Sequence, residues 1–149
     1  MNTTIVVLED EKATLDLMEI ALEEEGYDVI AINHHEPMEY FMDFGPQLIL
    51  LDIRLSNGYG NILCEDLKAN PITSMIPVIL VSGASNLVKI ANECKADGYL
   101  SKPFSVDELL SCVKALRAMT VLSGLPHLEP IAEGHAVFEI GRSTTCGVV

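Results

Sequence analysis

The chain has 149 residues, of which 49% are hydrophobic and 21% charged, and its formal net charge is −13. These totals are ordinary for one globular domain and leave too little chain for two domains of comfortable size. The negative charge argues against nonspecific binding to nucleic acid or anionic membranes, because both need clustered Lys and Arg. No apolar run approaches the ~18 residues of a membrane span, and no signal peptide is recognisable, so we expect a cytoplasmic protein.

Short apolar segments alternate with amphipathic segments along most of the chain. Each apolar run is rich in Val, Ile and Leu and ends in or beside a polar residue, which is typical of strands buried on both faces of a parallel sheet. In chain order, the predicted strands are residues 4–8, 27–32, 47–52, 77–82 and 99–102.

The amphipathic segments predict helices, because their apolar residues recur at the spacing of one helical face. In chain order, they cover residues 12–25, 33–44, 61–69 and 85–96, and a last helix follows Ser105. Gly26 stands where the first helix needs a C-cap, and turn formers at residues 56–60 precede the third helix. Ser105 and Glu108 fit the N-cap and N3 positions of a capping box.

Strands that alternate with helices predict a doubly wound α/β fold of the flavodoxin-like class. We expect a five-stranded parallel sheet in the order 2-1-3-4-5, with five flanking helices. This domain is assigned to residues 1–122, and residues 123–149 are interpreted as a flexible or loosely docked linker or tail. His135–Ile140 could form a strand there, and the start of another domain is the alternative.

The four cysteines show no Cys-x-x-Cys spacing, and three of them fall in predicted helices. They are Cys64, Cys94, Cys112 and Cys146. We therefore expect reduced and mostly buried thiols, which act as small hydrophobic residues.

Polar side chains gather where four of the predicted strands end. Glu9 and Asp10 follow the first strand, and Asp52, Ser82 and Lys102 end the third, fourth and fifth. Ligands bind at this edge of open α/β sheets. Carboxylates that share a pocket repel one another unless a cation neutralises them, and Mg²⁺ prefers such oxygen ligands. The sequence therefore predicts a magnesium site at this edge.

Beside such a cation, Asp52 could attack phosphorus as a carboxylate nucleophile. Lys102 would offer a positive charge to the phosphoryl oxygens, and the Ser82 hydroxyl would donate one hydrogen bond. Taken singly, these residues also fit plain roles, since an acid at a strand end is often a solvated loop residue. Their combination at one edge favours phosphoryl chemistry.

From about residue 3 to residue 120, the chain resembles the receiver domains of two-component response regulators, the CheY-like superfamily. Four motifs in order carry the resemblance, each at a strand end. They are Glu9-Asp10, Asp52-Ile-Arg-Leu-Ser-Asn-Gly-Tyr-Gly60, Ser82-Gly-Ala84 and Tyr99-Leu-Ser-Lys-Pro-Phe104.

The resemblance implies a phospho-acceptor and its metal ligands. Asp52 would accept the phosphoryl group and contribute to the Mg²⁺ site. Asp10 would ligate the ion directly, Glu9 would do so directly or through water, and the backbone carbonyl of Arg54 would complete the protein ligands.

The resemblance also implies a switch. Ser82 would be the hydroxyl that moves to the phosphoryl group, Tyr99 the aromatic residue that swings inward with it, and Lys102 the phosphate-binding lysine. The peptide bond to Pro103 would be cis, an isomer almost confined to proline.

Three positions bear on how this chain differs from its family. Ser56 stands where the family usually has proline, which loosens the loop without touching a ligand. Arg54 and Ala84 occupy the two positions that often tune dephosphorylation. We hypothesise that Arg54 sets the lifetime of the phosphoryl group.

The resemblance thus predicts a phosphorylation-dependent signalling switch that catalyses only its own phosphorylation and dephosphorylation. The donor would be a histidine kinase or a phosphotransfer protein. The output would be protein binding, or a homodimer, through the face of the fourth helix, fifth strand and fifth helix. No nucleic-acid or membrane partner is expected, since the tail is short and Arg142 is its single basic residue. The alternatives are a receiver-fold binding module that is never phosphorylated and an aspartyl-phosphate phosphohydrolase.

Overall fold

The computed structural model describes residues 2–55, 58–123 and 146–149 of the chain. Side chains of residues 58 and 119–123 are outside this description. The predicted turn residue Ser56 and the possible strand at His135–Ile140 also lie outside the described residues, as does Arg142.

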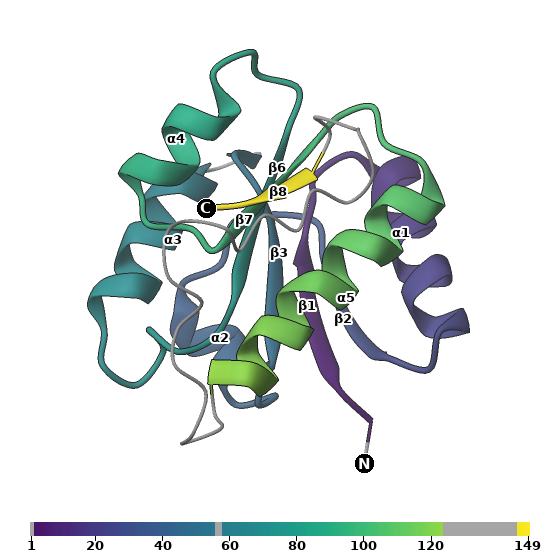
Figure 1. The fold of residues 1–149 in the computed structure, drawn as a ribbon, viewed down its shortest axis with the longest axis horizontal. Helices are drawn as coiled ribbons and strands as arrows, with labels where there is room; N and C mark the ends of the chain where they lie inside the picture. Colours follow the sequence, from purple (N-terminus) through teal and green to yellow (C-terminus); the bar gives the residue numbers. More distant parts are fainter. Residues whose placement is uncertain (1, 56–57, 124–145) are drawn as a thin grey trace.

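A central sheet orders its strands β2-β1-β3-β6-β7-β8 (Figure 1). Its parallel strands are β1 (Thr4–Leu8), β2 (Asp28–Ile32), β3 (Leu48–Asp52), β6 (Val78–Ser82) and β7 (Gly98–Ser101). The predicted five-stranded parallel sheet and its order 2-1-3-4-5 are confirmed. The structure adds a sixth strand that the sequence did not predict, β8 (Cys146–Val148), which pairs antiparallel with β7.

Helices cover both faces of this sheet, as predicted. Among the described residues they are α1 (Lys12–Glu24), α2 (Met38–Met42), α3 (Gly60–Ala69), α4 (Leu87–Glu93) and α5 (Val106–Ser123). Helices α1 and α5 lie on one face, and α2, α3 and α4 lie on the other (Figure 1). One cluster of buried apolar side chains fills the space between the sheet and the helices on each face. Every residue of β3 and β6 is buried, which explains their continuous apolar runs. No helix in the described part of the chain is long and apolar enough to cross a membrane.

Helix ends follow local chemistry. Gly26 has a φ of +93° after α1, as its predicted cap position requires. Ser105 and Glu108 form the predicted capping box, in which each backbone N–H donates to the other's side chain at 3.1 Å. Helix α2 begins at Met38 and is shorter than predicted. Pro37 is extended, with ψ 157°, and a proline also disfavours helical geometry in the residue before it.

The described ends of the loop after β3 pair as a small antiparallel hairpin that the sequence did not predict, β4 (Arg54–Leu55) with β5 (Gly58–Tyr59). Helix α3 then begins at once with Gly60. This hairpin leads the chain from the end of β3 directly into the helix that packs against it.

The expectation of four reduced cysteines is wrong. Cys112 on α5 and Cys146 on β8 form a disulfide, with Cα atoms 6.1 Å apart, while Cys64 and Cys94 are free and buried. The pair is separated by 34 residues. The two cysteines meet only because β8 docks beside β7, and no spacing in the sequence indicates that docking.

Candidate functional site

The predicted site residues meet where four neighbouring strands end. Glu9 follows β1, Asp52 ends β3, Ser82 ends β6, and Lys102 follows β7. The backbone N–H of Lys102 donates to the Ser82 carbonyl at 2.9 Å, which extends the pairing of β6 and β7 past the last strand residue. The parallel register of the sheet therefore brings these side chains to one edge.

Three carboxylates form the centre of the site. Oxygen atoms of Glu9, Asp10 and Asp52 all lie within 4.8 Å of one another. Glu9 and Asp52 are only 1% and 5% exposed, whereas Asp10 is exposed. Glu9 Oε1 is buried and makes no hydrogen bond of regular geometry. A buried, incompletely paired carboxylate oxygen in a cluster of hard oxygen donors fits a divalent cation such as Mg²⁺.

Lys102 supplies the positive charge of the cluster. Its Nζ atom lies 2.6 Å from Glu9 Oε1, an ion pair without regular hydrogen-bond geometry, and 3.3 Å from Asp52 Oδ2. One ammonium group beside three carboxylates leaves the cluster negative. The site can therefore accept a further cation.

Burial and neighbouring charges shift the pKa values of Glu9 and Lys102. Burial, together with the neighbouring Asp52, raises the pKa of the Glu9 carboxyl to about 7. Burial alone would lower the pKa of Lys102, but its contacts with Glu9 and the charge of Asp52 outweigh burial and raise it. Near neutral pH, Glu9 thus favours a proton or a nearby cation, and Lys102 stays charged.

Backbone amides hold the polar side chains in place. The N–H of Glu11 donates to Glu9 Oε2 at 3.2 Å, and the N–H of Arg54 donates to Asp52 Oδ1 at 3.1 Å. The side chain of Arg54 is exposed, and its main chain contacts Asp52. The roles predicted for the Arg54 carbonyl and side chain stay predictions.

The residues for which the sequence predicted a role in a switch lie on or next to β6 and β7. Ser82 is 7% exposed, and its Oγ accepts a hydrogen bond from the N–H of Ala84 at 3.1 Å. The Lys102–Pro103 peptide bond is cis, as predicted. Tyr99 is half-buried on β7 and packs against the apolar cluster under α4. Its proposed movement is not tested by this arrangement.

Gly60 is a site residue to which the sequence assigned no role. A Cβ atom at Gly60 would lie 2.0 Å from the carbonyl oxygen of Asp52 and 3.1 Å from Leu51 Cγ. The Gly60 N–H also donates to the carbonyl of Ile53 at 2.7 Å. The turn-rich composition of this loop signalled glycine, but only the packing of α3 on β3 shows that no side chain fits at this position.

Comparisons with known proteins agree with the fold. The model of the response regulator receiver domain family matches residues 5–114. A curated relative from Synechocystis sp., the "DNA-binding dual master transcriptional regulator RpaA", is 33% identical over 135 residues. That match covers 87% of this chain and 56% of the relative. The chain therefore spans about half the length of this curated relative.

Solved structures show the same architecture. A CheY-like response regulator receiver domain protein from Methanospirillum hungatei is 26% identical, with a TM-score of 0.73, and the match covers 83% of this chain and 100% of that one. NtrX from Brucella abortus is 25% identical, with a TM-score of 0.71 over 83% of this chain and 28% of its own. The matched part corresponds to the parallel sheet and its helices.

Proposed function

Because the chain belongs to the response regulator receiver domain family, we propose that it is a phosphorylation-dependent signalling switch with Asp52 as phospho-acceptor. The placement of Asp52 is the observation that carries this proposal. Its Oδ1 atom accepts from the N–H of Arg54 at 3.1 Å, and its Oδ2 atom lies 3.3 Å from Lys102 Nζ. One carboxylate is thus oriented by the backbone and faces a fixed positive charge.

We propose that Glu9, Asp10, Asp52 and the carbonyl of Arg54 hold Mg²⁺. The clustered carboxylate oxygens and the incompletely paired Glu9 Oε1 support this ligand set. Bound there, Mg²⁺ would supply the positive charge that lets an anionic phosphoryl donor approach an anionic site. The burial of Glu9 and Asp52 strengthens every charge interaction in the site.

In the proposed transfer, a carboxylate oxygen of Asp52 attacks the phosphorus of a phosphohistidine on a kinase or phosphotransfer protein. The oxygen–phosphorus bond forms as the phosphorus–nitrogen bond breaks, and the histidine nitrogen keeps the electron pair. Lys102 balances the negative charge on the phosphoryl oxygens, and Ser82 donates a hydrogen bond to one of them. The protein would act only on its own phosphorylation and dephosphorylation, with no separate substrate.

The output that we propose is a shift between two conformations. The phosphoryl group adds charge and hydrogen-bond acceptors at Asp52, which would draw Ser82 and Lys102 toward it. That movement would remodel the face made by α4, β7 and α5, where a protein partner or a second copy would bind. A net charge of −13 disfavours direct contact of this domain with nucleic acid or anionic lipid.

Intact-mass spectrometry after incubation with acetyl phosphate tests the proposal. Wild type should gain one phosphoryl group, about 80 Da, only when Mg²⁺ is present. Asp52→Ala should gain none, whereas Asp43→Ala, which removes an exposed acid at the C-cap of α2, should behave as wild type.

Three outcomes would contradict the proposal. An adduct on Asp52→Ala would assign the acceptor elsewhere. A wild type that takes up no phosphate and does not respond to beryllofluoride would instead be a binding module with a receiver fold. Turnover of a simple phosphate ester would favour the phosphohydrolase alternative.

A further inference from the structure

Strand β8 closes an edge of the sheet that is open in the predicted fold. It pairs antiparallel with β7, and the N–H of Val149 donates to the Asp97 carbonyl at 2.9 Å beyond the last pair. β8 lies over this edge between α4 and α5 (Figure 1). Without it, β7 would expose a row of unpaired backbone groups, which natural sheets usually cover.

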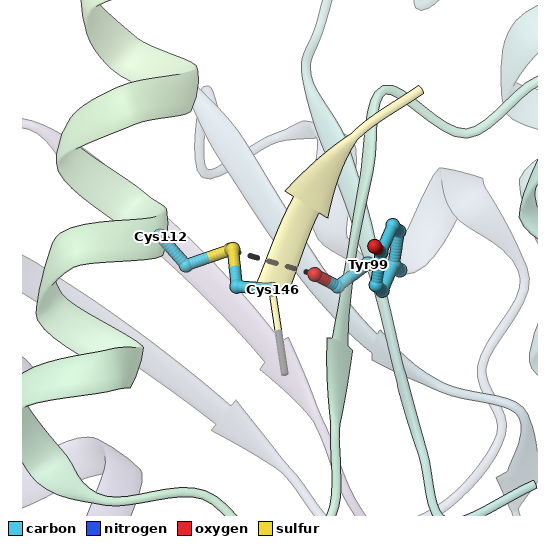
Figure 2. Close-up of a disulfide and its surroundings, with 3 residues drawn as sticks. All are labelled: Tyr99, Cys112 and Cys146. Carbon is cyan, nitrogen blue, oxygen red and sulfur yellow. Dashed lines mark hydrogen bonds between the residues drawn. A yellow bond between two sulfur atoms is a disulfide. The ribbon is translucent and has the colours of Figure 1, made fainter. Parts of the chain in front are cut away.

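A disulfide attaches this strand to the domain. Cys112 on α5 is fully buried, and Cys146 on β8 is 5% exposed. Figure 2 shows the bond beside β7, with the Cys112 sulfur 3.7 Å from the carbonyl oxygen of Tyr99. Since a disulfide sulfur carries no proton, this is a packing contact and not a hydrogen bond. The bond therefore joins α5 and β8 beside the backbone of β7.

β8 also contacts the side chain of Tyr99, which lies on the face of β7 opposite the disulfide. Successive strand residues point to opposite faces, so Gly147 faces away from the disulfide. A Cβ atom at Gly147 would lie 2.5 to 2.6 Å from three atoms of the Tyr99 side chain. Figure 2 shows the ring on the side of β7 away from Cys112. The ring thus packs directly on the backbone of β8.

The rest of the domain does not need β8 to complete its fold. The receiver family model matches residues 5–114, so Cys146 and its strand lie outside the matched region. The cluster of buried side chains under α2, α3 and α4 includes no residue of β8, whereas the cluster under α1 and α5 includes Cys146, with Val148 packed against it. Loss of the strand would leave five parallel strands and their helices in place.

From these contacts we propose that β8 is a strap under redox control: the Cys112–Cys146 disulfide holds it on β7, and reduction releases it and frees the ring of Tyr99. In oxidation, the S–H bonds of both cysteines break and one S–S bond forms. The two electrons and two protons pass to a low-molecular-weight disulfide, which leaves as two thiols. A dithiol reductant reverses the step.

Reduction weakens the strap because the contacts that remain are few. They are the short pairing with β7, the packing of Gly147 on Tyr99, and the packing of Cys146 and Val148 in the cluster under α1 and α5. β8 contributes three residues, and a strand pairing this short is marginal in water. The disulfide keeps Cys146 beside Leu100, its partner in the ladder, so that re-pairing stays a local event. After reduction, re-pairing requires closure of the chain between Cys112 and Cys146, which are 34 positions apart in the sequence.

Release of the strap matters for signalling only if the proposed function holds. Tyr99 is the residue expected to move on phosphorylation, and β7 belongs to the proposed output face. An oxidised strap would hold Tyr99 in one position and cover part of that face. The strap itself requires neither phosphate nor Mg²⁺, so it can be tested separately.

The first experiment tests whether the bond forms in the folded protein. The full chain is reduced, transferred to oxidised glutathione, then denatured and alkylated. Peptide mapping should find Cys112 linked to Cys146, with Cys64 and Cys94 alkylated. Failure of this pair to form, or a different pairing, would overturn the proposal.

The second experiment measures hydrogen–deuterium exchange across β7. Reduction should speed exchange in Gly98–Leu100 at least about tenfold and leave β1 and β3 unchanged. Cys146→Ser should match the reduced wild type without any reductant. Gly147→Val should speed exchange even when oxidised, because its side chain overlaps the ring of Tyr99.

Equal exchange in the oxidised and reduced proteins would overturn the proposal, because the strap would then stay in place without its bond. Asp52→Ala serves as the control that separates the two proposals. It should lose phosphorylation and keep the redox effect on β7. A failed phosphorylation assay therefore leaves the conclusion about the strap unaffected.

Discussion

At the scale of single residues, Gly60 sets how closely α3 approaches Asp52, the proposed phospho-acceptor. Gly60→Ala would place a methyl group 2.0 Å from the Asp52 carbonyl oxygen, so the backbone at the end of β3 must shift. We expect a loss of about 3 kcal/mol in the free energy of unfolding, measured with urea, and loss of phosphorylation. Gly83→Ala is the matched control, since the nearest atom, Lys102 Cβ, would be 3.9 Å away. Equal effects of the two variants would refute this account.

The backbone N–H of Arg54 donates to Asp52, the proposed phospho-acceptor, and the side chain of Arg54 is exposed. A guanidinium group over the phosphoryl oxygens would pair with them and hinder attack by water. Arg54→Ala should therefore shorten the phosphoryl lifetime, by about fivefold if one hydrogen bond of ~1 kcal/mol is lost. The decay of the mass adduct after removal of acetyl phosphate measures this rate.

The control for Arg54→Ala is Lys89→Ala, which changes an exposed residue of α4. An unchanged lifetime in Arg54→Ala would show that the side chain has no such role.

At the scale of elements, the capping box fixes where α5 begins. Ser105→Ala removes the oxygen that accepts from the N–H of Glu108 and should lower the free energy of unfolding by about 1 kcal/mol. Ser111→Ala removes the same atom inside α5, where alanine is the better helix former, and should be neutral or slightly stabilising. Urea unfolding of both variants checks the difference. A similar loss in both would mean that the cap contributes nothing specific.

The sequence predicted those elements whose signals are local. The five parallel strands were found because each is an apolar run that stops at a polar residue, as Leu48–Asp52 does. Helix α2 was predicted too long, because its apolar periodicity was given too much weight. Pro37 disfavours helical geometry in the residue before it, and the helix begins only after Pro37. β8 was missed because three residues carry no periodic pattern. Its pairing depends on β7 and on Cys112, both distant in the sequence.

The site was predictable to the same extent. Parallel strands end at one edge, so order along the chain was enough to bring Glu9, Asp52 and Lys102 together. What could not be predicted was how closely the backbone approaches its neighbours at two glycines. The requirement for glycine at Gly60 and at Gly147 comes from packing distances, which no residue spacing encodes.

At the scale of the whole molecule, stability should depend on pH through one buried carboxyl. The pKa of Glu9 is raised from 4.5 to about 7 in the folded protein. Between these values the folded state binds more protons than the unfolded state, so stability is greatest at the acidic end and falls as pH rises. Without divalent cations, the free energy of unfolding should fall by about 2 kcal/mol from pH 5.5 to pH 8.

Two sources of this pH dependence can be separated, because the chain also carries a net charge of −13. Repulsion among exposed carboxylates is screened by salt over about 8 Å at 0.15 M, whereas the interactions of buried Glu9 are screened much less. Urea unfolding at both pH values, in EDTA with low and high salt, therefore distinguishes them. In Glu9→Gln the salt-insensitive part should disappear, and this variant should be the more stable protein at pH 8. If Glu9→Gln keeps the full pH dependence at high salt, the titrating group lies elsewhere, and the carboxylate cluster is not what limits the stability of the cation-free protein.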